Sequence, residues 1–304
     1  MRDLISFSYN VDASNLEAFG DIFFMDHGDR YTYIIPVGEE KNTTFFHLLK
    51  FINESTNFNH VFTREGAATL LIRDKHFYCM ESKILIHRTI GNDQLDVPVL
   101  YPAEYPLAQH FKVKWIDKTK INEEYLNLAI DKTPKHLKSV LFDLATFYNH
   151  LTEEAYRLVA DFEDTTFSTS LCHARVKPET PLYEMFMPEY LVLDNRSRVY
   201  CEYLRYLFLE SNNMEKIEHI VARITSRYEL REKEWQFLYA RLFFPTHFYD
   251  LVYDIIIHGE INLQELFDQT SRYSDLLLKL PFFVQKYGNI LLDCPEWVKN
   301  ESIY

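Results

Sequence analysis

The spacing of apolar residues separates the chain into a strand-rich beginning and a helix-rich remainder. Short apolar runs with turn residues between them are typical of strands, because successive strand side chains point to opposite faces. One helix is predicted among these runs, because Asn42–Asn53 places its apolar residues on a single face. The turn Asp26–Asp29 predicts a hairpin between the first two runs. The predicted strands are Asp21–Met25, Arg30–Val37, His60–Thr63, Ala68–Arg73 and His76–Ser82.

After residue 103 the apolar residues recur at intervals of three and four, which is typical of helices. Proline and Gly-Asn-Asp residues in 89–103 indicate a connector before this part. One interruption is expected, a hairpin of Tyr190–Leu193 and Arg198–Tyr203 around the polar turn Asp194–Ser197. The predicted helices are Tyr105–Lys118, Leu137–Phe162, Met214–Arg227, Arg231–Phe244, His247–His258 and Leu263–Tyr287.

These patterns predict an α+β protein with two lobes. Residues 1–88 form a small antiparallel β-sheet lobe with one helix, and residues 89–103 connect it to the rest. Residues 104–304 form a larger, mostly helical lobe that contains the β-hairpin near 190–203. A chain of 304 residues is long enough to bury two separate cores.

The composition excludes several classes of function. The net charge is −13, from 32 Lys and Arg against 45 Asp and Glu, and no basic cluster is present, so nucleic acid is not an expected partner. The N-terminal residues lack the pattern of a signal peptide, and no apolar run reaches the length of a membrane span. The four Cys form no C-x-x-C pair and are expected to be reduced and buried. The twelve His show no zinc-ligand spacing, and we expect no metal site.

Three stretches carry a resemblance to a known family: RYTYIIPV at 30–37, FTREGAATLLIRDKHFYCM at 62–80, and PEYLVLDNRSRVYCEYLRY at 188–206. With the two-lobed layout, they resemble the aminoglycoside- and choline-kinase branch of the protein-kinase-like fold. Within that branch the chain is similar to the spore coat proteins of the CotS and YutH type from Bacillus-type endospore formers. The resemblance implies a kinase-like fold over nearly the whole chain.

The resemblance also implies where phosphoryl-transfer groups should lie, and most of them are missing. The phosphate-covering loop should join the first two strands, but the turn Asp26–Asp29 holds one Gly and two acids. The phosphate-binding Lys should lie in the next strand, and Arg30–Val37 contains none. A catalytic Asp should follow His173 by two residues, where Arg175 stands. A metal-binding Asp should fall near Val199–Arg205, where Glu202 is the sole carboxylate.

The three remaining positions of the degenerate cleft each have a structural and a functional interpretation. His173 is expected to brace its loop rather than take part in chemistry. Arg175 has the geometry to bind an anion, but a salt bridge to Glu179 or Glu202 is preferred. Glu202 alone is a weak Mg²⁺ ligand, so we expect an ion pair with Arg198 or Arg205. No catalytic residue, nucleotide or other cofactor is therefore assigned.

The favoured hypothesis is a non-catalytic, pseudokinase-like spore coat or coat-associated protein that acts in assembly or binding. It would be made in the mother-cell cytoplasm, reach the spore coat, and bind other coat proteins without entering a membrane. One alternative is a divergent ATP-dependent phosphotransferase for small molecules, which would need Glu202 or Asp194 to hold metal. A second alternative is a helical interaction module whose acidic cleft takes a basic peptide.

Overall fold

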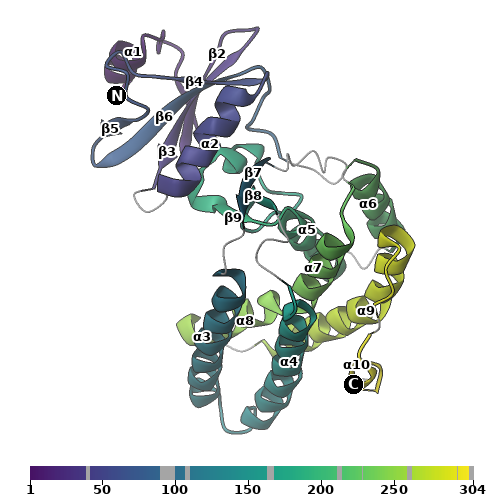
Figure 1. Ribbon diagram of the computed structural model, residues 1–304. Coiled ribbons are helices and arrows are strands. Elements are labelled where there is room, and N and C mark those ends of the chain that lie inside the picture. The colour runs from purple at the N-terminus through teal and green to yellow at the C-terminus, as the bar shows by residue number, and fades with distance from the viewer. Residues whose placement is uncertain are drawn as a thin grey trace. The chain divides into compact units, whose positions relative to one another are not determined.

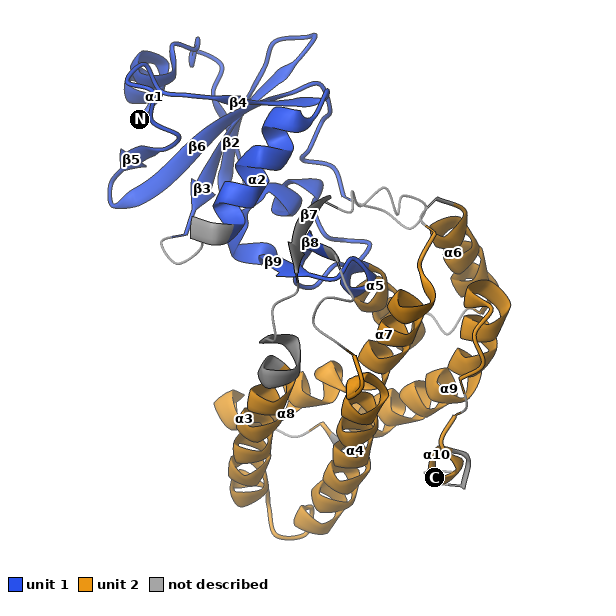
Figure 2. Ribbon diagram, viewed as in Figure 1, with its two compact units in different colours: residues 1–104, 169–199 blue, residues 105–168, 200–304 orange. Residues whose placement is uncertain are grey.

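The computed structural model describes residues 1–38, 42–89, 100–106, 110–162, 168–210, 214–227, 229–258, 262–292 and 294–300. The chain divides into two compact units, which Figure 2 distinguishes by colour. The first unit comprises Met1–Glu104 and Thr169–Val199, and the second comprises Tyr105–Ser168 and Tyr200–Tyr304. Each unit is therefore assembled from two separate stretches of sequence.

The first unit contains an antiparallel sheet in the order β1-β2-β3-β6-β4, with β5 paired to β6 (Figure 1). All five strands predicted from the sequence are present within two residues of their expected limits. The sheet also has an unpredicted first strand, β1. The strands are β1 (Glu17–Phe19), β2 (Ile22–Asp26), β3 (Tyr31–Val37), β4 (Phe58–Val61), β5 (Leu70–Ile72) and β6 (Lys75–Ser82).

Two helices bury the two faces of this sheet. Ile34 in β3 lies opposite Cys79 in β6, and both belong to an apolar cluster with Ile5 of helix α1 (Arg2–Tyr9). The neighbouring residue Tyr78 points to the other face, where its ring lies 5.4 Å from that of Phe45 in helix α2 (Asn42–Glu54). The sequence predicted α2 but not α1, so the sheet carries two helices rather than one.

A second sheet of the order β7-β8-β9 follows, formed by β7 (Leu100–Pro106), β8 (Ser168–His173) and β9 (Leu191–Asp194). The strands β8 and β9 are antiparallel, with Cys172 opposite Val192. Between them the chain makes two short 3₁₀ turns, η2 (Leu182–Phe186) and η3 (Pro188–Tyr190). The buried hydroxyl of Tyr78 donates to the Phe186 carbonyl over 2.7 Å, which ties this connection to the first sheet.

The expected hairpin near 190–203 is wrong in its second half. Arg198–Tyr203 belongs to helix α5 (Ser197–Glu210), and the partner of β9 is β8. The apolar residues of this stretch recur as the pairs Val199–Tyr200, Tyr203–Leu204 and Leu207–Phe208, and all six are buried. That spacing of four is helical, whereas the five residues from Val199 to Tyr203 imitate the alternation of a strand.

The second unit is helical, and most of its helices lie where the sequence predicts them. The main difference is α3, which begins after β7 and runs beyond Lys118, because its buried stripe continues through Leu126 and Ala129. Helix α4 runs through Thr152 without a break. Helix α9 likewise runs through Pro281 without a break, although proline often interrupts a helix. The helices are α3 (His110–Lys132), α4 (Lys138–Val159), α6 (Met214–Arg227), α7 (Glu232–Phe243), α8 (Thr246–His258), α9 (Leu263–Gly288) and α10 (Glu296–Asn300).

Aromatic side chains fill the core of the second unit. Tyr148 of α4 stacks on Phe248 of α8 at 3.9 Å between ring centroids, and its hydroxyl bonds Thr270 of α9 at 2.8 Å. Four aromatic residues from the end of α7 into α8 are buried, Phe243, Phe244, Phe248 and Tyr249, while Tyr253 is 46% exposed. Because the Tyr148 hydroxyl has a hydrogen-bond partner, its ring can be buried without leaving a polar group unpaired.

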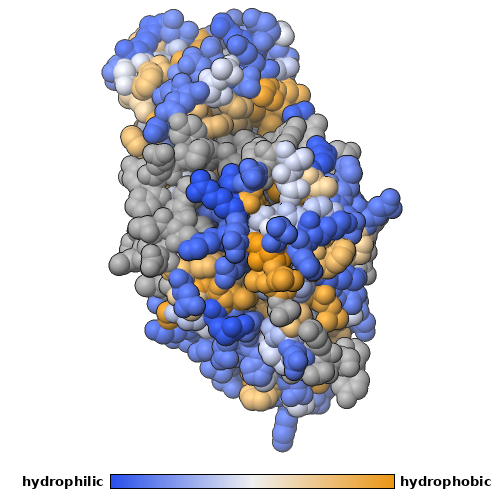
Figure 3. All heavy atoms as spheres, turned by 45° about the vertical axis from the view of Figure 1, so that its right-hand side comes forward, coloured by the Kyte–Doolittle hydropathy of each residue, from blue (hydrophilic) through white to orange (hydrophobic). Residues whose placement is uncertain are grey.

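The surface drawn in Figure 3 is mostly hydrophilic, with apolar side chains in separate patches. All four cysteines are buried thiols that form no disulfide, as the sequence predicts. Within the described part of the chain, no helix is both long and apolar enough to cross a membrane.

Candidate functional site

The candidate site lies in the first unit, where the chain leaves β8 and returns through β9. Antiparallel pairing places His173, the last residue of β8, opposite Leu191, the first residue of β9. The ladder extends one step further, because the Ala174 N–H donates to the Tyr190 carbonyl over 2.7 Å. The loop between the strands is thus held at both of its ends.

His173 braces this loop by contacts on both sides of its ring, and it is 2% exposed. Its Nδ1 accepts the Arg175 backbone N–H at 3.2 Å, and its Nε2 lies 3.4 Å from Oε2 of Glu184. The ring also stacks on Tyr190 with a centroid separation of 5.9 Å. Burial raises the pKa of the Glu184 carboxyl, and the nearby Glu189 raises it further, while Lys177 opposes the shift. These contacts fit the bracing role predicted for His173.

Arg175 stands two residues after His173, where the kinase-like pattern has a catalytic Asp. A guanidinium stays protonated at physiological pH and cannot accept a proton from a hydroxyl. The backbone of Arg175 is fixed by its bond to His173. The pairing of its side chain with Glu179 or Glu202 stays a prediction.

Asp194 is the carboxylate that ends β9, and a guanidinium is bound to it. Its Oδ2 accepts from NH1 of Arg198 at 3.0 Å, and its Oδ1 accepts the Asn195 backbone N–H at 2.7 Å. The same Arg198 donates through Nε and NH2 to the Ala174 carbonyl, at 3.3 and 3.0 Å. Arg198 therefore links the end of β9 to the loop that follows His173.

The backbone turn after Asp194 starts helix α5. The Asn195 side-chain oxygen accepts the Ser197 N–H at 2.9 Å, and the Asn195 carbonyl accepts the Arg198 N–H at 2.9 Å. Asn and Ser are favoured where a helix begins, because their side chains bond the free N–H groups of the first turn. Asn195 and Ser197 are visible in the sequence, and residues of this kind are typical of a helix start as well as of a hairpin turn.

The turn between the first two strands is Gly20–Asp21, because β1 precedes β2. The position assigned to the phosphate-covering loop, Asp26–Asp29, is therefore wrong: that turn joins the second and third strands. Gly20 has a φ of +57°, and a Cβ there would lie 2.9 Å from the Tyr183 hydroxyl. Burial raises the pKa of this Tyr183 hydroxyl, as do Glu184 and Asp21. The first turn is closely covered by the loop between β8 and β9.

A cavity of about 890 Å³ borders this first turn within the same unit. Its lining combines Gly20 and Asp21 with Arg73 and Lys75 at the turn between β5 and β6. These two cations could bind an anion, although the carboxylates of Asp21, Asp74 and Glu189 line the same cavity.

Glu202, the third residue of the predicted cleft, has a different role. It lies on α5 in the second unit, where its Oε1 accepts from NH1 of Arg205 at 3.0 Å. The predicted ion pair with Arg205 is confirmed, while Arg198 binds Asp194 instead. The sequence-based interpretation took the start of α5 for a strand, and the carboxylate that ends a strand in this stretch is Asp194.

Asp194 is the carboxylate at the end of β9, and its charge is compensated by Arg198. Among the described residues, no group of three or more His, Cys, Asp or Glu side chains is arranged to hold a metal ion. A Mg²⁺ ion at Asp194 would compete with the Arg198 guanidinium for the charge of this carboxylate.

Comparisons with known proteins identify the fold and the family. A family model described as "Spore coat putative kinase YutH" matches residues 102–277, which is more than half of the chain. No curated protein matches the chain at a significant level.

Among solved structures, the chain is similar to an aminoglycoside phosphotransferase from Alicyclobacillus acidocaldarius, with 15% identity, a TM-score of 0.59, and coverage of 94% of this chain and 92% of the other. It is also similar to a spectinomycin phosphotransferase in complex with ADP and spectinomycin, with 12% identity, a TM-score of 0.50, and coverage of 90% and 93%. At these identities the likeness establishes the kinase-like fold predicted from the sequence.

Proposed function

The chain belongs to this YutH spore coat family, and we propose that it is a coat or coat-associated protein that binds and does not phosphorylate. On this proposal it is a pseudokinase, in which the kinase-like fold is a scaffold for assembly. It is made in the mother-cell cytoplasm, is deposited on the forespore, and binds other coat proteins.

The contact of Arg198 with Asp194 is the observation that supports a non-catalytic role best. In kinases an Asp near the end of the corresponding strand holds Mg²⁺, which neutralises the phosphate charge. Here the guanidinium lies 3.0 Å from Oδ2 of Asp194 and is also anchored on the Ala174 carbonyl. The charge that a metal would neutralise is therefore already compensated by a guanidinium that the chain itself supplies.

Two further positions support the same proposal. Arg175 replaces the proton acceptor of the catalytic loop, and the strand β3 (Tyr31–Val37) contains no Lys for the phosphates. Phosphoryl transfer depends on positioned charges, so loss of base, phosphate-binding Lys and metal together removes most of the catalytic stabilisation.

Nucleotide binding tests the proposal directly. The thermal midpoint of the purified chain is measured with ATP and Mg²⁺, with ATP and EDTA, and for the variants Asp194→Asn and Arg198→Met. A ligand that binds the folded state raises the midpoint. We expect no Mg²⁺-dependent shift in the parent chain. A shift that needs Mg²⁺ and disappears in Asp194→Asn would refute a non-catalytic role.

The role in the coat is tested in spores. A strain lacking the gene is complemented with the parent chain, with Asp194→Asn, and with Arg175→Ala. We expect all three chains to be recovered in the coat fraction and to restore coat assembly equally. If Asp194→Asn folds and enters the coat but fails to restore assembly, chemistry at Asp194 is required and the proposal is wrong.

A divergent phosphotransferase is the second candidate, and a specific observation favours it. Asp194 ends β9, the position at which a kinase-like fold has its metal-binding carboxylate. The cavity beside Gly20 also offers Arg73 and Lys75 to an anion. The same thermal-shift experiment distinguishes this candidate, because it requires Mg²⁺-dependent binding of ATP.

A further inference from the structure

Two helices of the second unit, α3 and α8, pack against each other and leave apolar side chains exposed beside their contact (Figure 1). On α3 these side chains recur at intervals of four and three residues, and on α8 at an interval of four, so each set forms one stripe along its helix. The rings of Tyr125 and Tyr253 lie 5.7 Å apart, which brings the two stripes side by side. Five side chains, each between 37% and 53% exposed, form this α3–α8 face: Ile121, Tyr125, Leu128, Tyr253 and Ile257.

The two helices that carry the α3–α8 face are anchored from below and to each other. Ala129 of α3 and Ile255 of α8 are buried, so the opposite side of each helix belongs to the core. Near the end of α3, Lys132 donates to the Ile256 carbonyl of α8 at 2.6 Å. A contiguous apolar patch on anchored helices is typical of an interaction surface, whereas single exposed apolar residues are not.

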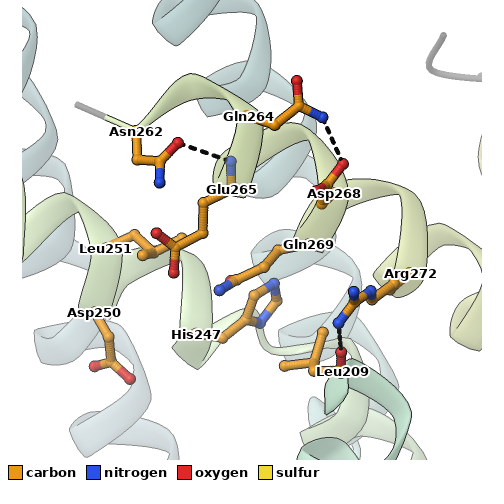
Figure 4. Close-up of a pocket in the computed structure, with 10 residues that line it drawn as sticks. All are labelled: Leu209, His247, Asp250, Leu251, Asn262, Gln264, Glu265, Asp268, Gln269 and Arg272. Carbon is orange, nitrogen blue, oxygen red and sulfur yellow. Dashed lines mark hydrogen bonds between the residues drawn. The ribbon is translucent and has the colours of Figure 1, made fainter. Parts of the chain in front are cut away.

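The side of α8 that faces α9 carries a different set of residues. Figure 4 shows His247 and Leu251 of α8 lining a pocket together with Gln269 of α9. In the same view the carboxylate of Asp250 points away from Gln269. No residue of the α3–α8 face lines this pocket, so α8 has neighbours on two sides and presents a third side to solvent.

Acidic residues flank the α3–α8 face along both of its long sides. On α3, the exposed residues Asp117, Glu124 and Asp131 recur every seven residues and form a row beside the apolar stripe. On α8, Asp250 and Asp254 each lie three residues before a residue of the face, on the side away from α3. An apolar centre between two acidic rows is complementary to a surface with an apolar centre and basic edges.

Three lysines of α3 lie near these carboxylates, and two of them are engaged within the chain. Nζ of Lys118 lies 5.5 Å from the centroid of the Phe244 ring, and Lys132 is bonded to a carbonyl of α8. Lys120 is exposed on the outer side of α3, four residues before Glu124. The five carboxylates outnumber these lysines, so the surroundings of the α3–α8 face are acidic, in a chain of net charge −13.

We propose that the α3–α8 face binds an amphipathic helix of a partner protein, in which an apolar stripe is flanked by Lys and Arg. Ile121 and Leu128 are about 10 Å apart along α3, so a partner helix of about three turns covers the stripe. Its basic side chains lie over the two acidic rows. A second copy of the chain fits less well, because it would bring acidic rows together. The inference names the kind of partner for the binding role proposed above and rests on that role.

Fluorescence anisotropy with three labelled peptides of about four helical turns tests the chemistry of the partner. The first peptide places Leu at helical spacing with Lys on both sides, the second has Glu in place of every Lys, and the third has the composition of the first in an order that gives no apolar face. We expect saturable binding of the Leu–Lys helix, one peptide per chain, with the other two at least about tenfold weaker. Added salt should weaken this binding, because exposed charge pairs are screened.

Variants locate the binding on the α3–α8 face. Leu128→Lys places a cation in the apolar stripe, and Glu124→Lys reverses one charge of the acidic row. They should weaken binding of the Leu–Lys helix about tenfold and about fivefold. The matched controls Leu278→Lys and Glu153→Lys make the same changes at exposed positions of α9 and α4, and should bind as the parent chain does. Because each control changes the net charge equally, a general attraction of basic peptides to an acidic chain would not distinguish it from its counterpart.

Sedimentation velocity of the chain without peptide tests the competing occupant. We expect a sedimentation coefficient that Leu128→Lys leaves unchanged. A dimer that this variant dissociates would assign the face to a second copy and overturn the proposal. Absence of binding by the Leu–Lys helix, equal binding of the Leu–Glu helix, or unchanged affinity of folded Leu128→Lys and Glu124→Lys would also overturn it. None of these outcomes alters the ATP measurement, so failure of this inference is distinguishable from failure of the proposed function.

Discussion

The buried ion pair of helix α5 gives the sharpest test of how the helical unit is stabilised. The side chains of Arg205 and Glu202 are 6% and 12% exposed, and NH1 of Arg205 lies 3.0 Å from Oε1 of Glu202. Its NH2 donates to the Arg241 and Phe244 carbonyls, the latter at 3.2 Å, and so fixes the end of α7. Arg205→Met keeps the apolar volume but leaves Glu202 and two carbonyls without their donor.

We expect Arg205→Met to lower the free energy of unfolding by about 3–5 kcal/mol, the usual cost of breaking a buried ion pair on one side. The measurement is urea unfolding followed by circular dichroism. The double variant Arg205→Met, Glu202→Gln should recover about 1–3 kcal/mol, because no buried charge then lacks a partner.

The exposed pair of Arg157 and Glu154 is the control. The side chain of Arg157 is 71% exposed, so Arg157→Met should cost less than about 1 kcal/mol. If Arg205→Met costs no more than this control, or if the double variant recovers nothing, burial does not govern the strength of the Arg205 pair and the reasoning fails.

Three further predictions concern close packing, titration and a buried hydroxyl. Gly288→Ala should destabilise the chain by about 1–3 kcal/mol in urea unfolding, because a Cβ there would lie 2.8 Å from the Trp235 ring; an unchanged midpoint would contradict this. His247 has a folded pKa of about 3, and an unfolded His has one of about 6.5, so the unfolded state binds the proton first. The free energy of unfolding should therefore fall by up to about 1.4 kcal/mol per unit as pH drops from 6.5 toward 3, and His247→Phe should lose this slope; equal slopes at pH 4.5–6.5 would count against it. Tyr78→Phe should cost about 1–3 kcal/mol, because the buried Phe186 carbonyl loses the Tyr78 hydroxyl that donates to it; thermal unfolding checks this, and an unchanged midpoint would contradict it.

The strands of the first unit could be predicted because turn residues separate their runs. The same reasoning missed α1 and β1, which are short and bury few side chains. In α1 only Ile5 and Tyr9 are buried. Two apolar residues four positions apart occur by chance in many segments, so this spacing does not by itself predict a helix. Their burial depends on the sheet beneath them, and that arrangement is tertiary information.

The error at Arg198–Tyr203 has a different origin. Five residues fit a strand and a helix equally well, and only the longer stripe through Phe208 separates the two periods. Recognition of α5 would have placed Asp194 four residues before Arg198 at a helix start, so their ion pair could have been predicted. The bond from Arg198 to the Ala174 carbonyl could not, because it joins residues 24 positions apart through the β8–β9 pairing.

The division of the first unit into two stretches has a consequence for synthesis on the ribosome. Residues 1–104 emerge early, but the unit also contains Thr169–Val199, which supplies β9 and the bond from Tyr78 to Phe186. Another 95 residues must be translated between positions 104 and 199, which takes roughly 5–20 s. During that interval the nascent sheet keeps one face incompletely covered. Folding of the first unit must therefore wait until part of the helical unit has been translated, so the synthesis of the two units overlaps.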